Sequence, residues 1–90
     1  MVERNLRIAG VEVDLVADDR GVTVLVEVKA RARSDFGGAA LAVDARKRER
    51  LRRAAAVAGR GARGVRIDVV AVELEADGAR LRHYRNAVES

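Results

Sequence analysis

The sequence has no cysteine, no proline and only one histidine, His83, among its 90 residues. Without cysteine the chain can form no disulfide, no thiolate nucleophile and no cysteine-containing zinc site. One histidine excludes a histidine-cluster metal centre and argues against a Ser-His triad. Any metal site in this chain would therefore need oxygen ligands.

Aromatic side chains are almost absent, since Phe36 and Tyr84 are the two that the chain contains. The core must be built from valine, leucine, isoleucine and many alanines, so we expect it to be thin. The length fits one small domain over residues 1–90. The scarcity of aromatic residues also argues against recognition of single-stranded nucleic acid by base stacking.

Long apolar runs are missing too: the longest have five residues, whereas a membrane span needs roughly 18. Residues 1–5 lack the apolar core of a signal peptide. We therefore expect a cytoplasmic protein without membrane contact. Basic residues exceed acidic ones by 18 to 14, a net charge of +4, which favours polyanionic partners such as nucleic acid.

The patterning predicts five strands and one main helix in the order βββαββ. The helix begins at about Asp44, which is either its N-cap or an acid of its first turn, and it stops at Gly59. Its inward stripe comprises Val43, Lys47, Leu51, Ala54, Ala55 and Ala58. The predicted strands cover residues 5–9, 11–17, 22–29, 66–73 and 80–85, with a turn at 18–21 and a loop at 30–38.

Charged residues gather on the second and third predicted strands. Residues two apart in a strand point to one face, so Glu27 and Lys29 project together. If the loop holds two or four residues, Ala17 lies opposite Val22, and Glu12 and Asp14 come to that same face. Asp14 and Glu27 then become diagonal neighbours, about 7–8 Å apart at Cβ. A three-residue loop would reverse the parity and separate these groups.

Such an arrangement suits a hard divalent cation. The carboxylates of Asp14 and Glu27, with the backbone carbonyl of Val28, are ligands that Mg²⁺ or Mn²⁺ accepts at a phosphodiester. Lys29 would orient the attacking water and stabilise the charge that develops on the phosphate. The alternative is that these side chains form an exposed cross-strand salt ladder without chemistry.

A second group of residues is basic. The predicted helix carries Arg46, Arg50 and Arg53 along one stripe, which can follow a phosphate backbone or simply be a solvated helix face. Lys47 lies on the Leu51 stripe, where it either approaches the acidic face or extends to solvent. Arg31 and Arg33 follow the predicted strand at residues 22–29, which carries Glu27 and Lys29 and is called the motif strand below. They lie either near a scissile phosphate or in an ordinary loop. Asp68 is predicted to be a strand-end hydrogen-bonding residue rather than a third metal ligand, and His83 a surface or edge residue rather than a catalytic one.

The sequence also resembles a known family. The string from Val24 to Arg31, preceded by residues 12–16, looks like the YraN family of small bacterial proteins, grouped with Holliday-junction resolvases among the PD-(D/E)xK nucleases. Further similar segments are Arg4-Asn5, Phe36-Gly37, Ala42-Val43 with Lys47 and Leu51, residues 67–72 and residues 83–87. The resemblance covers residues 4–88.

This resemblance implies a restriction-endonuclease-like α/β fold and places Asp14, Glu27 and Lys29 at the nuclease motif positions, accompanied by Glu12. Family members begin about one helix earlier, so the N-terminal helix is expected to be absent here, and Val11 replaces the glycine usual before the first acid. We therefore expect a Mg²⁺-dependent endonuclease acting on structured or branched DNA, with homodimerisation compatible with the fold. The alternatives are a non-catalytic nucleic-acid-binding or assembly module, and a small basic protein-interaction domain.

Overall fold

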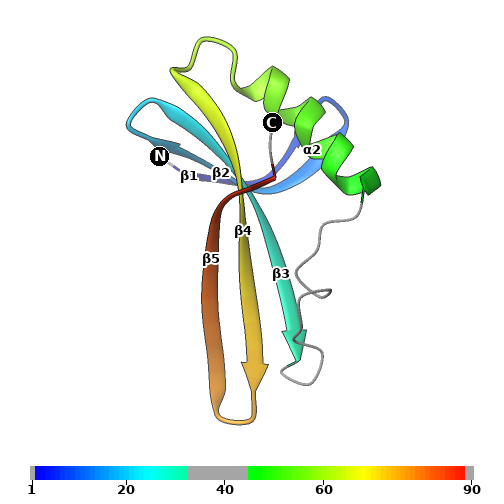
Figure 1. The fold of residues 1–90 in the computed structure, drawn as a ribbon, viewed down its shortest axis with the longest axis vertical. Coiled ribbons are helices and arrows are strands. Elements are labelled where there is room, and N and C mark those ends of the chain that lie inside the picture. Colours follow the sequence, from blue (N-terminus) through cyan, green and yellow to red (C-terminus); the bar gives the residue numbers. More distant parts are fainter. Residues whose placement is uncertain (1, 33–44, 89–90) are drawn as a thin grey trace.

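The structure, a computed structural model, describes residues 2–32 and 45–88, with residues 31 and 32 described through their backbone. It is a mixed α/β domain in which the order βββαββ is confirmed (Figure 1). The elements are β1 (Val2–Ile8), β2 (Val11–Asp19), β3 (Val22–Ala32), α2 (Ala45–Ala58), β4 (Gly64–Glu75) and β5 (Gly78–Val88).

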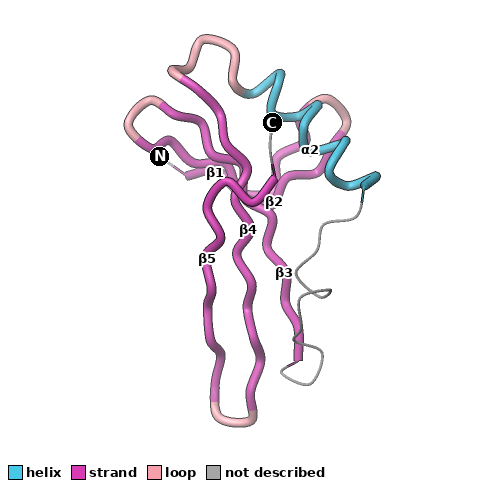
Figure 2. The backbone as a smooth tube through the Cα atoms, in the orientation of Figure 1, coloured by secondary structure: helices cyan, strands magenta, loops and turns pink. Residues whose placement is uncertain are grey.

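The strands of the described chain form one sheet in the order β1-β2-β3-β4-β5. Neighbours pair antiparallel except β3 and β4, which run parallel and are joined through α2. A parallel pair needs such a crossover because the chain must return to the starting edge before the next strand begins. Figure 2 shows α2 on one side of this sheet.

The turn between β2 and β3 contains two residues, Arg20 and Gly21, because Asp19 pairs with Val22. Two residues is one of the two turn lengths that were predicted, but Ala17 pairs with Val24 and not with Val22, so the predicted register was wrong by two residues. Arg20 and Gly21 have φ values of 54° and 90°, as expected for the turns whose twist matches the flanking strands. A register shift of two residues preserves the face of each directly paired residue. Glu12, however, alternates with the buried Val11 and Val13 and so points to the opposite face.

Several strands are longer than the side-chain pattern predicted. β1 begins at Val2, which pairs with Ala17. β3 continues to Ala32 beside Leu74 of β4, so the first three residues of the predicted loop at 30–38 belong to the strand. β4 and β5 likewise continue to their turn, where Glu75 pairs with Gly78. Backbone pairing extends a strand wherever a partner runs alongside, irrespective of apolar alternation.

The core lies between α2 and the sheet. Leu51, Ala54 and Ala55 are fully buried, and Ala58 packs partly against them, which confirms these members of the predicted stripe. Val43 and Asp44, the predicted start of the helix, lie outside the described residues. The side chains of the sheet that complete this core cluster are Val11, Val13, Leu25, Ile67, Val69 and Val88. Within the described ranges, no helix has both the length and the apolar character required to cross a bilayer.

Truncation of Leu51 should destabilise the domain strongly. Its side chain is fully buried, so Leu51→Ala removes apolar contacts and leaves a cavity, at a cost of about 2–5 kcal/mol. Leu81→Ala is the matched control because Leu81 is 68% exposed, and we expect a change within about 0.5 kcal/mol. Urea unfolding monitored by circular dichroism measures both variants. Equal midpoints for the two would contradict the observed packing.

Candidate functional site

Asp14 lies where β2 separates from β3. The ladder between these strands ends at the pair Leu15 and Val26. Beyond it, Oδ2 of Asp14 accepts a hydrogen bond of 2.8 Å from the backbone N–H of Val28. The carboxylate thus replaces a ladder partner at the point of separation. Asp14 and Glu27 each lie one position beyond this last pair, so the register on which the predicted diagonal relation rested was wrong.

Glu27 faces α2 and meets a lysine from it. Oε2 of Glu27 lies 3.5 Å from Nζ of Lys47, and the two side chains are 14% and 31% exposed. Burial raises the pKa of Glu27; the Lys47 ammonium opposes this rise, the Asp14 carboxylate adds to it, and the Lys29 ammonium again opposes it. The net result is a raised pKa, because the surroundings disfavour the ionised carboxylate more than the two lysines favour it.

Lys29 follows Glu27 by two positions on β3 and is half-buried. Alternation along the strand gives it the same face as Glu27. The structure therefore brings Asp14, Glu27 and Lys29 into one neighbourhood, where the charges of Asp14 and Lys29 both act on the Glu27 carboxyl group. Lys47 joins them from the helix, and we call these four residues the acid–lysine cluster. Lys47 was predicted either to approach the acidic face or to extend to solvent, and the structure shows that it approaches the acidic face.

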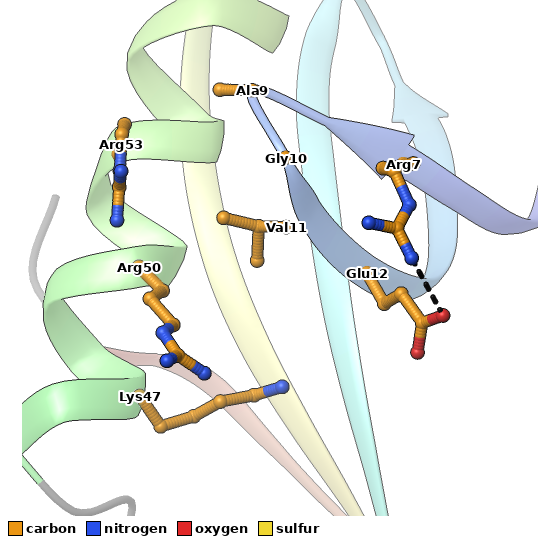
Figure 3. Close-up of a pocket in the computed structure, with 8 residues that line it drawn as sticks. All are labelled: Arg7, Ala9, Gly10, Val11, Glu12, Lys47, Arg50 and Arg53. Carbon is orange, nitrogen blue, oxygen red and sulfur yellow. Dashed lines mark hydrogen bonds and ion pairs between the residues drawn. The ribbon is translucent and has the colours of Figure 1, made fainter.

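A cleft of about 630 Å³ opens beside this cluster, between α2 and the first hairpin (Figure 3). Lys47, Arg50 and Arg53 line it from the helix, and Arg7 and Glu12 line it from the hairpin. In Figure 3 the Lys47 side chain extends from the helix toward the sheet. Four cations and one carboxylate make the cleft strongly basic. Lys47 belongs both to the cleft and to the ion pair with Glu27, so it links the two.

The remaining predicted residues lie in different places. Glu12 is exposed and pairs with Arg7 across the first hairpin, 3.3 Å between Oε1 and Nη2. Arg46 is exposed on α2 outside the cleft lining. The backbone of Arg31 pairs beside Glu73 in the sheet, and Arg33 lies outside the described residues. Of the predicted phosphate contacts, Lys47, Arg50 and Arg53 therefore share one cleft.

The donor set of the acid–lysine cluster suits a hard cation in type but is small in number. Asp14 and Glu27 supply carboxylate oxygens, the ligands that Mg²⁺ and Mn²⁺ prefer. The half-buried Glu27 already holds one monovalent cation, Lys47, so this position stabilises positive charge. No group of three or more metal-ligating side chains occurs among residues 2–32 and 45–88. A divalent ion here would bind two side chains and complete its shell with water, and the Val28 carbonyl stays a prediction.

A buried ionic network was not recognised in the sequence. Asp68 is fully buried inside β4, so the prediction that it lies at a strand end was wrong, whereas the prediction that it is hydrogen-bonded is confirmed. Its carboxylate accepts hydrogen bonds from Arg66 Nε at 3.1 Å and from the backbone N–H of Asn86 at 2.8 Å. His83 Nε2 lies 2.8 Å from Oδ2, so this edge residue, which remains half-exposed, is also part of the network. The signal in the sequence was an acid in an apolar run with an arginine two positions earlier.

This network determines the pKa of Asp68. Burial favours the neutral carboxyl group, but the hydrogen bonds from Asn86, Arg66 and His83 outweigh that effect, and the pKa is lowered. The same contacts shape β5, because the register against β4 shifts between Ile67 and Val69 and Asn86 has a φ of 52°. Asp68 therefore holds an irregularity of the edge strand in place.

Comparisons with known proteins identify relatives of this chain. The profile of the uncharacterised protein family UPF0102 matches residues 1–72. A UPF0102 protein of Burkholderia pseudomallei (strain 1106a) is 49% identical over 92 residues, which cover 97% of this chain and 60% of that protein. A UPF0102 protein of Halorhodospira halophila is 45% identical over 85 residues, 93% of this chain and 67% of that protein.

The chain thus spans about 60% of the length of the Burkholderia relatives that it matches. No solved structure gives a significant match. The family profile covers most of the chain and agrees with the YraN-like resemblance that the motif strand carries. The chain belongs to the UPF0102 family.

Proposed function

We propose that this protein binds structured or branched DNA and hydrolyses its phosphodiester bonds with Mg²⁺ or Mn²⁺, on a restriction-endonuclease-like fold. The observation that carries the proposal is the acid–lysine cluster at the end of a basic cleft. Two carboxylates on neighbouring strands, two lysines beside them and an open surface lined by Arg50 and Arg53 form a combination suited to a phosphate ester.

Each residue of the acid–lysine cluster would have a separate role in the hydrolysis. Asp14 and Glu27 would hold the divalent ion, which when bound supplies Lewis acidity and lowers the pKa of water. Lys29 would orient the attacking water and stabilise negative charge on the phosphate, since its ammonium is a compact donor. Asp14 is preoriented for its role by the hydrogen bond from Val28. Lys47 would exchange its contact with Glu27 for a phosphate oxygen of the bound strand.

The cleft supplies the affinity. Cations that contact phosphates release condensed counterions, so binding is expected to weaken steeply with salt. Lys47, Arg50 and Arg53 project from successive turns of α2 and line one side of the cleft. A backbone that follows the helix would meet them in sequence. The scissile phosphate would then come close to Glu27, because Lys47 reaches both groups.

A specific observation favours a second candidate, a non-catalytic nucleic-acid-binding or assembly module. The Glu27 carboxylate is already paired with Lys47 at 3.5 Å, and the acid–lysine cluster contains two carboxylates. In this alternative the lysine permanently replaces the metal ion and the cleft alone is functional. Homodimerisation stays a prediction under both alternatives.

Binding of labelled duplex and four-way-junction DNA, measured by fluorescence anisotropy between 50 and 200 mM salt, tests the cleft. We expect the Arg50→Ala/Arg53→Ala variant to reduce the slope of log K against log salt by about 1.8, or 0.9 per lost phosphate contact. Arg48→Ala/Arg52→Ala is the matched control, because both residues are exposed on α2 outside the cleft lining. Equal slopes of log K against log salt for the two double variants would contradict the proposal that the cleft binds the phosphate backbone. Cleavage assays with Mg²⁺ and Mn²⁺ on the same DNAs separate the enzyme from the binding module.

A further inference from the structure

A second basic cleft, of about 790 Å³, lies at the hairpin end of the sheet. Its lining includes three arginines from three separate segments: Arg20 from the β2–β3 turn, Arg63 from the connector before β4, and Arg85 from β5. Asp19 and Val22, paired with each other, complete the lining. Val22 alternates with the core-facing positions of β3, so this pair belongs to the sheet face that points away from α2. The acid–lysine cluster, by contrast, faces α2.

The arginines of this second cleft are held by the backbone around them. The N–H of Arg63 donates to the carbonyl of Gly21 at 2.9 Å. The Arg63 stem packs over Gly21 so closely that a Cβ there would lie 2.7 Å from Cδ of Arg63. Arg20 has a φ of 54°, a left-handed conformation that costs a branched or long side chain energy and favours asparagine or glycine. A charged side chain is therefore presented from a strained turn.

Positive charge is in surplus around the second cleft. Arg66 bridges Asp19 and Asp68, at 2.9 and 3.1 Å, and Arg85 lies 3.5 Å from Asp19. Two guanidinium groups, those of Arg66 and Arg85, thus share two carboxylates. The side chains of Arg20 and Arg63 have no carboxylate of the described residues within 4.0 Å. A guanidinium fork matches the oxygens of a phosphate group, and several forks from different directions favour a ligand with more than one negative charge.

We propose that the second cleft, lined by Arg20, Arg63 and Arg85, is a binding site for phosphate groups, separate from the acid–lysine cluster. In this site the guanidinium groups of Arg63 and Arg85 donate hydrogen bonds to the phosphate oxygens, and Arg20 donates a further one from the β2–β3 turn. The phosphates belong either to a second segment of nucleic acid or to a free oligophosphate, because both present the same oxygens. Since the two clefts lie on opposite faces, one straight duplex segment does not fill both.

Titration of ¹⁵N-labelled full chain with pyrophosphate tests the site directly. We expect shifts of the backbone amides around Gly21 and Arg63, and an affinity at least tenfold lower in Arg63→Ala/Arg85→Ala. Arg20→Asn removes one charge while supplying a residue that suits positive φ, so it should bind pyrophosphate more weakly and melt no lower than wild type. Arg60→Ala is the control, since Arg60 is exposed in the same connector but outside the lining. Absence of amide shifts at this site, or an equal loss in Arg60→Ala, would overturn the proposal.

A parallel titration with duplex DNA distinguishes the sources of phosphate. If nucleic acid is the ligand, Arg63→Ala/Arg85→Ala weakens DNA binding and reduces its salt slope by about 1.8. If wild type binds pyrophosphate at this site but no DNA, the ligand is a free oligophosphate, and the proposed DNA-binding function fails while this site stands. If wild type binds DNA but the variant loses affinity for neither ligand, this site fails and the proposed function stands.

Discussion

Replacement of Glu27 by glutamine is expected to abolish metal-dependent cleavage while leaving the domain folded. The change removes one of two carboxylates at the proposed cation site and keeps the shape of the side chain. Loss of a metal ligand that stabilises the transition state by several kcal/mol corresponds to a fall in rate of about a thousandfold. Isothermal calorimetry with Mg²⁺ or Mn²⁺ should show the accompanying loss of metal binding, which does not depend on finding the right DNA substrate.

The stability of Glu27→Gln gives a second measurement on the same variant. The surroundings raise the pKa of Glu27, so at neutral pH they disfavour the ionised form that the unfolded chain carries. Removal of this charge is therefore expected to leave the melting temperature unchanged or higher. The raised pKa also means that metal binding by wild type weakens as the pH falls toward that pKa, earlier than for an ordinary carboxylate. A carboxyl group whose pKa is raised by burial beside a cleft is typical of a functional residue.

The control is Glu49→Gln, because Glu49 is exposed on α2, where its Oε2 lies 3.6 Å from Nη1 of Arg52 in the same helix. It removes the same charge from the chain without touching the acid–lysine cluster. Unaltered metal affinity in Glu27→Gln would refute the proposed cation site. Metal binding that is lost equally in both variants would do the same, because it would report net charge alone.

The second large effect is expected at Asp68. Asp68→Asn removes a fully buried carboxylate that accepts from Arg66 and Asn86. Separating a buried charge from its partners costs about 3 kcal/mol or more, since Arg66 loses its ion pair with Asp68 and the backbone N–H of Asn86 loses a charged acceptor. Urea unfolding at neutral pH measures the loss. Asp77→Asn is the control, because Asp77 is exposed in the turn between β4 and β5.

The effect should depend on pH in a defined direction. The folded state lowers the pKa of Asp68 below its ordinary value of 3.8. The stabilisation is therefore fully present above that value and disappears as the pH falls through the lowered pKa. The difference in unfolding free energy between wild type and Asp68→Asn should accordingly narrow in strong acid. A difference that stays constant down to the acid limit would show that the network contributes through shape rather than charge.

Patterning alone was sufficient for the element order and for the inner face of α2. Leu51, Ala54 and Ala55 repeat at helical spacing and are buried as predicted, because only one helical face can meet the sheet. Glu27 and Lys29 share a face for an equally local reason, the alternation of a strand. Both regularities depend on neighbours in the sequence, so no knowledge of the tertiary structure was needed.

Register and long-range contacts, by contrast, were decided by the folded chain. The turn residues 18–21 allow two or four residues between the strands, and only the packed sheet selects the two-residue turn, in which Asp19 pairs with Val22. Lys47 meets Glu27 because the crossover positions α2 above β3. Asp68 is buried because β5 bends over it, and His83 and Asn86 become its partners from 15 and 18 residues away.

The amino-acid sequence by itself thus determined which residues carry charge, which faces they occupy within each element and which family the motif strand resembles. The tertiary structure decided which of those faces meet. Periodicity acts through covalent geometry within an element, whereas the pairing of distant carboxylates, lysines and arginines depends on strand register and on the path of the connections. The acid–lysine cluster was predictable in its strand residues, and the Asp68 network and the second cleft were not, because their members come from separate elements.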